Sequence, residues 1–368
     1  VADVNKDKII NIRPINFIRM KILHISNFVQ KQKGRLQWNH CFKINNGFIR
    51  NGHNVCTFSD RDMSRMNLIN KLNNNKNLNK SLIETFKNFY PDLVVLGHAD
   101  KVHQETLNEF KSINKNIKII EWNVDNYFLD NTEKKLKSKS HLIDAYFITN
   151  ADKAIRSCLS DNNSISFFPN IFDKSIENFR VFENHSYDYD VFYALSYGVG
   201  TGKIRNIKSD YDREIFLDHI SENYPKIKTN FFGYSGKQPV WGNEFERELN
   251  KSPISLNLSR KPYLKFYSSD RISQYLGNGS CIFIDLNSKL DELFTNEEAI
   301  FFDSYDVASL GEKLYETLKN INNVRLIAKK GWERGHKYYN ERIITDYFLD
   351  IAFNGKPIKN YNWPLHTY

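Results

Sequence analysis

The side chains best suited to holding an anion gather between residues 265 and 271, where the sequence reads KFYSSDR. Two adjacent serines can cap a helix that starts at the following aspartate, and the free N–H groups of a helix N-terminus attract anions. A lysine and an arginine add positive charge, and a tyrosine offers a ring for stacking. The segment predicts a phosphate or diphosphate site, with an ordinary capped helix as the structural alternative. The residues concerned are Lys265, Tyr267, Ser268, Ser269, Asp270 and Arg271, together with Gly277 at the end of the helix.

A second candidate lies between residues 196 and 205, which read SYGVGTGKIR. Gly198 and Gly200 let the backbone approach a ligand closely, and Lys203 and Arg205 supply positive charge. The spacing differs from that of a P-loop, which requires G-x4-G-K-[ST]. A ligand-facing loop and a flexible surface turn both fit this composition.

The elements that must position these residues follow a regular pattern, because short apolar runs alternate with helical patterns from residue 21 onward. This alternation is typical of parallel βαβ units, and continuous apolar runs indicate strands buried on both faces. We expect one set of strands at 21–25, 54–58, 93–96, 117–122, 145–149 and 166–168, and a second at 191–195, 230–232, 254–258, 281–284 and 299–302. Helical segments are expected between the strands, including 40–50, 81–89, 152–159 and 307–318.

The fold class predicted from this pattern is α/β, with two doubly wound Rossmann-like domains facing each other across a cleft. The expected parts are an N-terminal extension at 1–19, a first domain at 20–175, a second domain at 185–340, and a C-terminal helix and tail at 341–368 that packs back towards the first domain. Ligands of such sheets bind at the carboxyl ends of the strands, so the cleft between the domains is the predicted site.

Polar side chains in the first half of the chain follow predicted strands and therefore belong to the same cleft. His98 follows the third strand, and Glu121 and Asp125 lie at the end of the fourth. A histidine titrates near neutrality and a partly desolvated carboxylate can accept a proton, so each is a candidate base, with a structural role as the alternative. The loops after the first and second strands add Arg35, Asp60 and Arg61.

Composition narrows the class of protein. Hydrophobic residues make up 40% and charged residues 26%, which indicates a globular chain. The net charge of +9 fits attraction of phosphate-bearing ligands, an anionic membrane surface, or only a lysine-rich solvated surface, and no nucleic-acid-binding motif is present. Four cysteines without a CxxC pair indicate free thiols rather than zinc ligands. No apolar run reaches about 18 residues, so we expect a cytoplasmic protein, with contact to the inner face of the membrane left open.

The stretch from residue 255 to residue 339 resembles the C-terminal domain of GT-B-fold glycosyltransferases, most of all the group that includes the spore-maturation CgeB-like proteins. The residues that carry the resemblance are Asn257 and Ser259 at a strand end, the segment 267–271, the helix stop at Gly277 and Gly279, and the turn formed by Glu292, Leu293 and Phe294. The first half is similar more loosely, for example in the NGHNV sequence at 51–55.

This resemblance implies that the second domain binds a nucleotide-activated sugar and the first domain binds the acceptor, without a metal ion. It implies donor contacts from the anion-site residues and the glycine loop already named, and also from Asn257, Ser259 and Arg260. In this scheme His98, Glu121 and Asp125 are the candidate bases or nucleophiles. Arg35, Asp60 and Arg61 would contact the acceptor.

One feature departs from that family. Many retaining GT-B enzymes carry a Glu-x7-Glu pattern at the donor site, whereas residues 285–292 read DLNSKLDE. The usual sugar and ribose contacts therefore cannot be transferred to this chain. A DxD-like triplet, from Asp188 to Asp190, precedes a predicted strand instead of following one, and we interpret it as a linker rather than a metal site.

The function expected from these observations is transfer of a sugar from a nucleotide-activated donor to a glycan or lipid-linked acceptor, in bacterial surface polysaccharide biosynthesis. A Kdo transferase that uses CMP-Kdo is a narrower alternative. A non-catalytic module that binds a phosphorylated ligand, and a sugar-nucleotide epimerase with a related fold, are alternatives of other classes.

Overall fold

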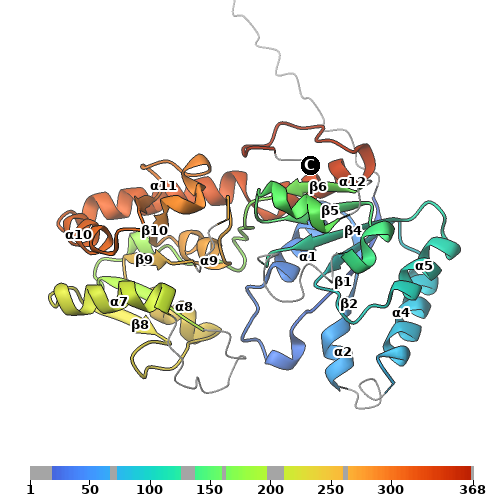
Figure 1. Cartoon of the computed structure of the whole chain (residues 1–368), viewed down its shortest axis with the longest axis horizontal. Coiled ribbons are helices and arrows are strands. Elements are labelled where there is room, and N and C mark those ends of the chain that lie inside the picture. The colour runs from blue at the N-terminus through green and yellow to red at the C-terminus, as the bar shows by residue number, and fades with distance from the viewer. Residues whose placement is uncertain are drawn as a thin grey trace, which may run out of the picture.

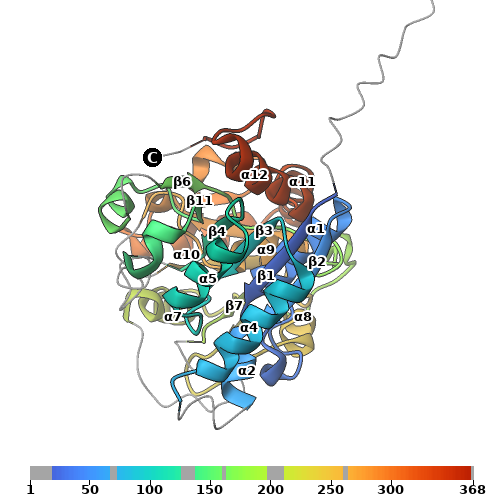
Figure 2. The same ribbon diagram turned by 90° about the vertical axis from the view of Figure 1, so that its right-hand side faces the viewer.

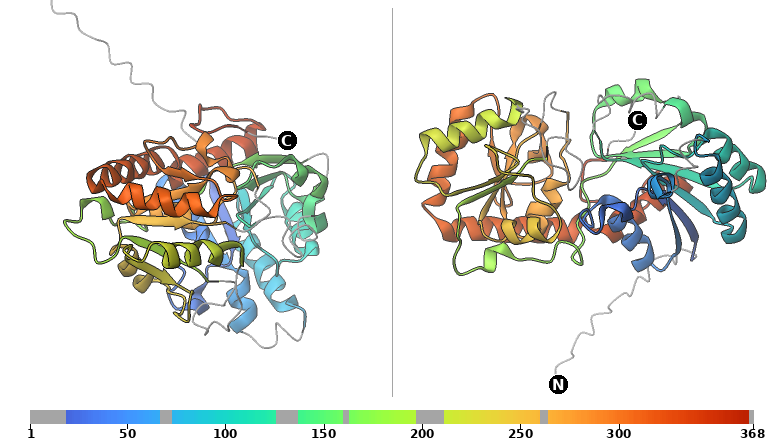
Figure 3. Two further views of the ribbon diagram at one scale, coloured as in Figure 1. Left: turned by 60° about the vertical axis from the view of Figure 1, so that its left-hand side comes forward. Right: turned by 90° about the horizontal axis from the view of Figure 1, so that it is seen from below.

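The computed structural model describes residues 19–66, 73–125, 137–159, 163–196, 211–259 and 264–365. Within these ranges the chain forms two α/β domains that lie side by side, each built on its own parallel sheet (Figure 1, Figure 3). The predicted fold class is therefore confirmed.

The sheet of the first domain has the strand order β2-β1-β3-β4-β5-β6, and all neighbouring strands are parallel. Successive side chains of a strand point to opposite faces, so both faces carry apolar side chains. One face packs on α1 (His40–Arg50) and α12 (Glu341–Asn354), and the other on α4 (Lys76–Phe89) and α5 (Gln104–Ile113), which are prominent in Figure 2. The strands are β1 (Lys21–Ser26), β2 (Asn54–Ser59), β3 (Leu93–Gly97), β4 (Lys118–Asn123), β5 (Ala145–Ile148) and β6 (Ser164–Phe167), and α2 (Asp60–Met66) follows β2.

The sheet of the second domain has the order β11-β10-β9-β7-β8 and is also parallel throughout. Its helices on one face are α7 (Tyr211–Asn223), α10 (Val307–Leu318) and α11 (Ile321–Tyr338), and on the other face α8 (Asn243–Leu249) and α9 (Arg271–Gly277). The strands are β7 (Val191–Ala194), β8 (Thr229–Phe232), β9 (Ile254–Asn257), β10 (Cys281–Asp285) and β11 (Ile300–Phe302).

Two segments connect the domains. The linker after β6 leads into β7, and α12 returns from the second domain to lie against α1 of the first. Helices α1 and α12 approach closely because Gly47 has no side chain: a Cβ there would lie 2.2 Å from the backbone oxygen of Glu341. A single apolar cluster contains Phe48 of α1, Phe172 of the linker and Leu276 of α9, so the domains share part of their core.

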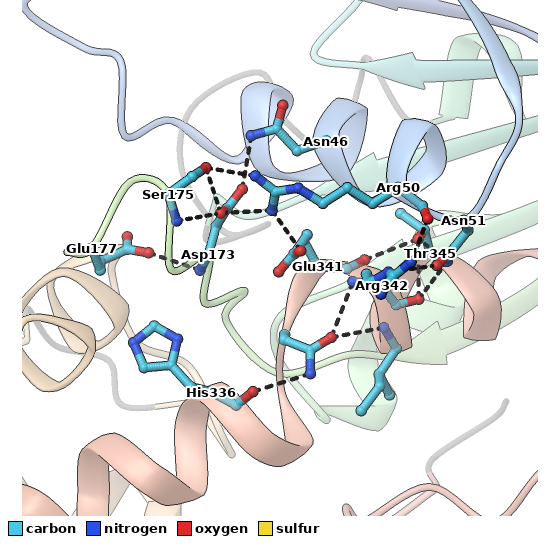
Figure 4. A network of polar contacts seen from close by, with 12 residues as sticks. Asn46, Arg50, Asn51, Asp173, Ser175, Glu177, His336, Glu341, Arg342 and Thr345 are labelled. Carbon is cyan, nitrogen blue, oxygen red and sulfur yellow. Dashed lines mark hydrogen bonds and ion pairs between the residues drawn. The ribbon is translucent and has the colours of Figure 1, made fainter.

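A polar network fixes the linker against α1 and α12 (Figure 4). The Nη1 of Arg50 donates to Asp173 Oδ1 at 2.8 Å and to Glu341 Oε1 at 2.5 Å, and its Nη2 donates to Ser175 Oγ at 2.6 Å. Asn46 Nδ2 donates to the second oxygen of Asp173 at 2.7 Å. These bonds lower the pKa of Asp173, against the opposing effect of burial. The linker is therefore held from both sides.

Next to this network lies a buried ion pair between Lys43 of α1 and Glu177 of the linker. The Nζ of Lys43 also donates to the backbone oxygen of Ile171 at 2.9 Å and to Ser273 Oγ of α9 at 3.1 Å. One ammonium group thus connects the first domain, the linker and the second domain.

The predicted strands overlap the observed ones throughout, and the predicted helices at 40–50 and 307–318 have the observed bounds. The predicted helical segment at 152–159 is present as a 3-10 helix, Lys153–Cys158. The predicted cap of α9 was wrong. Neither serine caps α9, because its N-cap residue is Asp270 and no side chain caps it. The hydroxyl of Ser268 instead accepts a bond from the Asn257 side chain at 3.0 Å.

Cys41 and Cys281 are buried free thiols, and Cys56 is a half-buried one. Among the helices within the described ranges, none has the length and apolar character needed to cross a membrane.

Candidate functional site

Two adjoining cavities lie between the domains, at the carboxyl ends of their strands. The larger cavity measures about 230 Å³ and is lined mainly by the second domain. The smaller cavity measures about 190 Å³ and is lined mainly by the first. Val124, Asp125 and Asp270 line both, so they form the junction at which a molecule in one cavity meets a molecule in the other.

The larger cavity has broad aromatic and apolar walls. Trp38 reaches it from the loop after β1, whereas Val240 and Trp241 come from the segment between β8 and α8. Flat rings and apolar surface suit a heterocyclic base or a sugar ring. Its lining consists of Trp38, Val124, Asp125, Ala194, Leu195, Ser196, Pro239, Val240, Trp241, Phe245, Tyr267, Ser269, Asp270, Arg271 and Gln274.

Arg271 is the cation in the described lining of the larger cavity. Its Nη2 donates to the backbone oxygen of Leu258 at 2.7 Å, and its guanidinium carbon lies 5.4 Å from the ring centre of Tyr193. These contacts hold the side chain in place. Within the described part of the chain, its Nε and the hydroxyl of Ser269 are buried without a hydrogen-bond partner. Unpaired buried donors are costly unless a ligand satisfies them, so this wall suits an anionic oxygen.

Asp270 stands at the junction and is held from across the cleft by His40, the first residue of α1. His40 Nδ1 lies 3.0 Å from Asp270 Oδ1. Burial alone would raise the pKa of Asp270, but His40 and Lys43 outweigh it, so the pKa is lowered. Asp270 therefore carries a negative charge at neutral pH.

His98 and Asp125 form the second polar pair at the junction, with His98 Nδ1 3.5 Å from Asp125 Oδ2. His98 directly follows β3 in a left-handed conformation, with φ of 50°, and its ring stands edge-on to Trp122 at 5.5 Å. Burial lowers the pKa of His98 despite the opposing effect of Asp125. A neutral imidazole beside a carboxylate can accept a proton, so this pair has the chemistry of a general base.

The smaller cavity is polar. Its lining combines the junction residues with His98 and Trp122, with Arg61 of α2, and with side chains from the ends of β1 and the loop that follows. Arg61 Nε donates to Asp100 Oδ1 at 2.7 Å. The lining consists of Ser26, Asn27, Asn39, Arg61, His98, Trp122, Val124, Asp125 and Asp270.

Several predicted site residues lie elsewhere. Glu121 pairs in register with Leu96 and Tyr146, on the sheet face covered by α4 and α5, so it points away from the cavities. Burial raises its pKa to about 7. Asp60 is buried beneath Arg61, where its Oδ2 accepts a bond from a backbone N–H, and burial raises its pKa to about 6.

In the second domain, Lys265 forms an exposed ion pair with Glu292, 3.0 Å apart, and does not line either cavity. Gly277 serves packing, because a Cβ there would lie 2.9 Å from the Glu177 side chain. Asn257 and Ser268 are buried behind the cavity wall, and Ser259 lies at the end of the described strand segment. Exposed Arg35 lies beside Gly242 of the second domain.

The predicted glycine loop falls outside the described residues, as do Gly198, Gly200, Lys203, Arg205 and Arg260. Sequence reasoning missed His40, Trp241 and Gln274. Trp241 follows an apolar pair after β8, a pattern that could have drawn attention to it, whereas His40 stands in an ordinary helix start.

The residues at 210–350 match a family model described as glycosyl transferase-like. Sucrose-phosphate synthase of Thermosynechococcus elongatus has a similar structure, with a TM-score of 0.57 at 11% identity over 92% of this chain and 100% of that one. The chain has the two-domain GT-B fold. HepE of Anabaena, in complex with UDP and glucose, is similar with a TM-score of 0.55 at 10% identity, over 90% of this chain and 99% of that one. A trehalose-6-phosphate synthase is similar with a TM-score of 0.56 at 10% identity, over 90% of this chain and 99% of that one. No curated protein matches the chain in sequence.

The family match covers the second domain from α7 onward, and with it most of the wall of the larger cavity. Trp38 and the junction residues of the first domain lie outside the matched segment. The structural similarity extends over both domains and establishes the two-domain fold.

Proposed function

We propose that the chain transfers a sugar from a nucleotide-activated donor in the larger cavity to a glycan acceptor in the smaller one. The observation that carries this proposal is the shared junction. Asp125 and Asp270 line both cavities, so a donor sugar and an acceptor hydroxyl would meet beside two carboxylates and His98. Such proximity is the main requirement of a transfer reaction.

The donor site is proposed from the chemistry of the larger cavity. Trp38, Trp241 and Tyr267 offer ring surfaces for a nucleobase or a sugar. Arg271 is anchored through one amino group, which leaves its Nε and the Ser269 hydroxyl for a diphosphate. That HepE of Anabaena is described in complex with UDP and glucose supports a nucleotide sugar of this kind.

The proposed base is the His98–Asp125 pair. Both residues line the smaller cavity, and the pair can take the proton of the acceptor hydroxyl as the glycosidic bond forms. Asp270 is placed to stabilise positive charge that develops on the donor sugar. Asp285 and Glu292, in the region of the Glu-x7-Glu pattern, line neither cavity, so the donor sugar would be held by other groups.

We further propose that transfer is independent of metal ions, because Arg271 can take the place of a cation at the diphosphate. Among the described residues, no group of three or more His, Cys, Asp or Glu side chains could hold a metal ion. The triplet from Asp188 to Asp190 precedes β7, at the strand end opposite the cleft. A role in surface polysaccharide biosynthesis at the membrane is the proposed setting, supported by the resemblance to the CgeB-like group.

The test is transfer of a labelled sugar. The full chain is incubated with UDP-, GDP-, dTDP- and CMP-linked sugars and a panel of glycan acceptors, with and without EDTA. We expect one donor class to give a labelled product at equal rates in both conditions. A CMP-linked donor would point to the Kdo alternative. Tight binding with neither transfer nor hydrolysis would instead support a non-catalytic binding module.

A further inference from the structure

The charges around the smaller cavity indicate what kind of acceptor it admits. Among the described residues that line it, Asp125 and Asp270 are acidic, Arg61 is basic and His98 is the titratable ring between them. A ligand loses contact with water when it enters the cavity. The charges of the lining therefore decide which charged groups of a ligand the cavity can bind.

The positive charge of Arg61 is already matched. Its Nε donates to Asp100 Oδ1 at 2.7 Å, and Lys101 Nζ lies 3.3 Å from the other oxygen of Asp100. Buried Asp60 accepts a bond from the Lys101 backbone N–H, and burial raises its pKa although the charge of Arg61 lowers it. Two cations therefore face two carboxylates, and little positive charge remains to attract an anionic ligand.

The remaining lining adds negative charge. Burial alone would raise the pKa of Asp270, but His40, 3.0 Å away, lowers it, so Asp270 is ionised at neutral pH. Asp125 is more than half exposed, with 59% of its side chain accessible, and so presents its carboxylate to an incoming molecule. Burial lowers the pKa of His98, which leaves this ring neutral rather than cationic at neutral pH.

The other groups that line the cavity make hydrogen bonds without charge. Asn27 and Asn39 contribute amides, and Ser26 contributes a hydroxyl that donates to the backbone oxygen of Gly97 at 2.8 Å. Carboxylates and amide oxygens accept hydrogen bonds from hydroxyl and ammonium groups. The cavity volume of about 190 Å³ is enough for one sugar unit of an acceptor.

We propose that the smaller cavity selects an acceptor whose reacting sugar unit is neutral or carries an amino group, and that it rejects a phosphorylated unit. This inference rests on the proposed function, because it treats the smaller cavity as the acceptor site. The two carboxylates repel phosphate, and the paired Arg61 does not compensate for them.

The test measures binding of matched monosaccharides to the full chain by calorimetric titration at pH 7.5. Glucose, mannose, N-acetylglucosamine and glucosamine are each compared with their 6-phosphates. We expect at least one parent sugar to bind, with its phosphate at least tenfold weaker. In Asp125→Asn the ratio of affinities between the parent sugar and its phosphate should fall at least threefold. Asp291→Asn removes an exposed carboxylate outside the cavity and should leave this ratio unchanged.

Equal or tighter binding of the phosphates, or binding by no sugar of the set, would overturn the inference. Nucleotide binding is titrated in the same samples, so that a failure of the acceptor inference can be distinguished from a failure of the proposed function. If a nucleotide binds but phosphates are preferred, only the acceptor inference fails. If no nucleotide binds at all, the proposed function itself fails.

Discussion

Glu121 and Asp125 stand four residues apart in the sequence, yet they occupy different environments. Glu121 is within β4 and faces the core beneath α4 and α5, where burial raises its pKa to about 7. Asp125 lies beyond the strand end, 3.5 Å from His98 and in contact with both cavities. The carboxyl group of Glu121 is therefore buried away from any substrate, whereas that of Asp125 is accessible to one.

The first prediction distinguishes these two carboxylates. Asp125→Asn should lower kcat by about 100-fold or more, because it removes the partner of the proposed base. Glu121→Gln should leave kcat nearly unchanged, since the amide imitates the protonated acid and does not reach the cavities. Steady-state kinetics of both variants measures this, and a large kcat loss in Glu121→Gln alone would reverse the assignment.

The second prediction concerns stability at low pH. Burial lowers the pKa of His336 to about 4 and that of His24 to about 3, against about 6.5 in an unfolded chain. Below pH 6.5 the unfolded chain therefore binds protons that the folded protein does not. Each group should lower the free energy of unfolding by up to about 1.4 kcal/mol per pH unit, from pH 6.5 down to its folded pKa.

Denaturant unfolding at pH 7, 6 and 5 tests this expectation. His336→Gln should lose less stability on acidification than the wild type, because glutamine does not titrate. Its amide can still donate to the Gly277 backbone oxygen that His336 contacts at 2.9 Å. His185→Gln, at an exposed position, is the matched control. Identical pH slopes in all three proteins would contradict the account.

At the residue scale, site residues were predicted best where they lie next to the end of a strand or helix in the sequence. His98 and Asp125 follow the ends of β3 and β4, and residues 267–271 lead into α9. The structure brings Tyr267, Arg271 and Asp125 to one cavity. The position of Lys265 outside it depends on a side-chain direction that chain order does not encode. His40 acquires its importance from a contact across more than two hundred residues, which no local pattern reveals.

At the scale of elements, helices α1 and α12 determine how the C-terminal segment meets the first domain. Their contact depends on Gly47, where an added Cβ would lie 2.2 Å from a backbone oxygen and 2.7 Å from the Thr345 side chain. A backbone oxygen cannot move aside without shifting the whole of α12. The position of a small residue thus decides the spacing of two helices.

The third prediction follows from that spacing. Gly47→Ala should lower the free energy of unfolding by about 1–3 kcal/mol, because the overpacking outweighs the gain in helix propensity. Ile49→Ala changes an exposed residue of the same helix and should have little effect. Thermal and denaturant unfolding compare the two, and a stabilised Gly47→Ala protein would show that the helices are less tightly packed.

Strands were predicted more completely than helix ends. Apolar runs such as CIFID at β10 are buried on both faces, and their hydrophobicity alone marks them. The start of α9 near Asp270 was predicted, but its cap was not. The two serines before it form other contacts or none, because capping depends on backbone geometry that composition does not specify.

At the scale of the whole molecule, the linker and α12 fix the relative position of the two domains on either side of the cavities. The buried pair of Lys43 and Glu177 lies where α1, the linker and α9 meet. Burial raises the pKa of Glu177 to about 7, which Lys43 opposes. Each of the two groups therefore makes the burial of the other tolerable.

The fourth prediction is a double-mutant cycle at this pair. Lys43→Met should lower the free energy of unfolding by on the order of 3 kcal/mol, because it leaves a carboxyl group buried without its partner. The double variant Lys43→Met/Glu177→Leu should recover most of the loss. Additive losses from the two substitutions, measured by denaturant unfolding, would mean that the groups do not act as a pair.

The arrangement of domains was accessible from sequence because the pattern of strands and helices repeats twice. The shape of the cleft was not, since its walls combine Trp38 from the first domain with Trp241 and Arg271 from the second. Only the folded chain places these side chains around one space.

The central claim is that the larger cavity binds a nucleotide through Arg271. Calorimetric titration of UDP, GDP, dTDP and CMP into the wild type, Arg271→Ala and Lys265→Ala tests it most directly. We predict that one nucleotide binds the wild type and Lys265→Ala equally, and binds Arg271→Ala about 10- to 100-fold more weakly, as expected for the loss of a charge-assisted hydrogen bond. Unchanged affinity in Arg271→Ala, with circular dichroism showing all three proteins folded, would contradict the account.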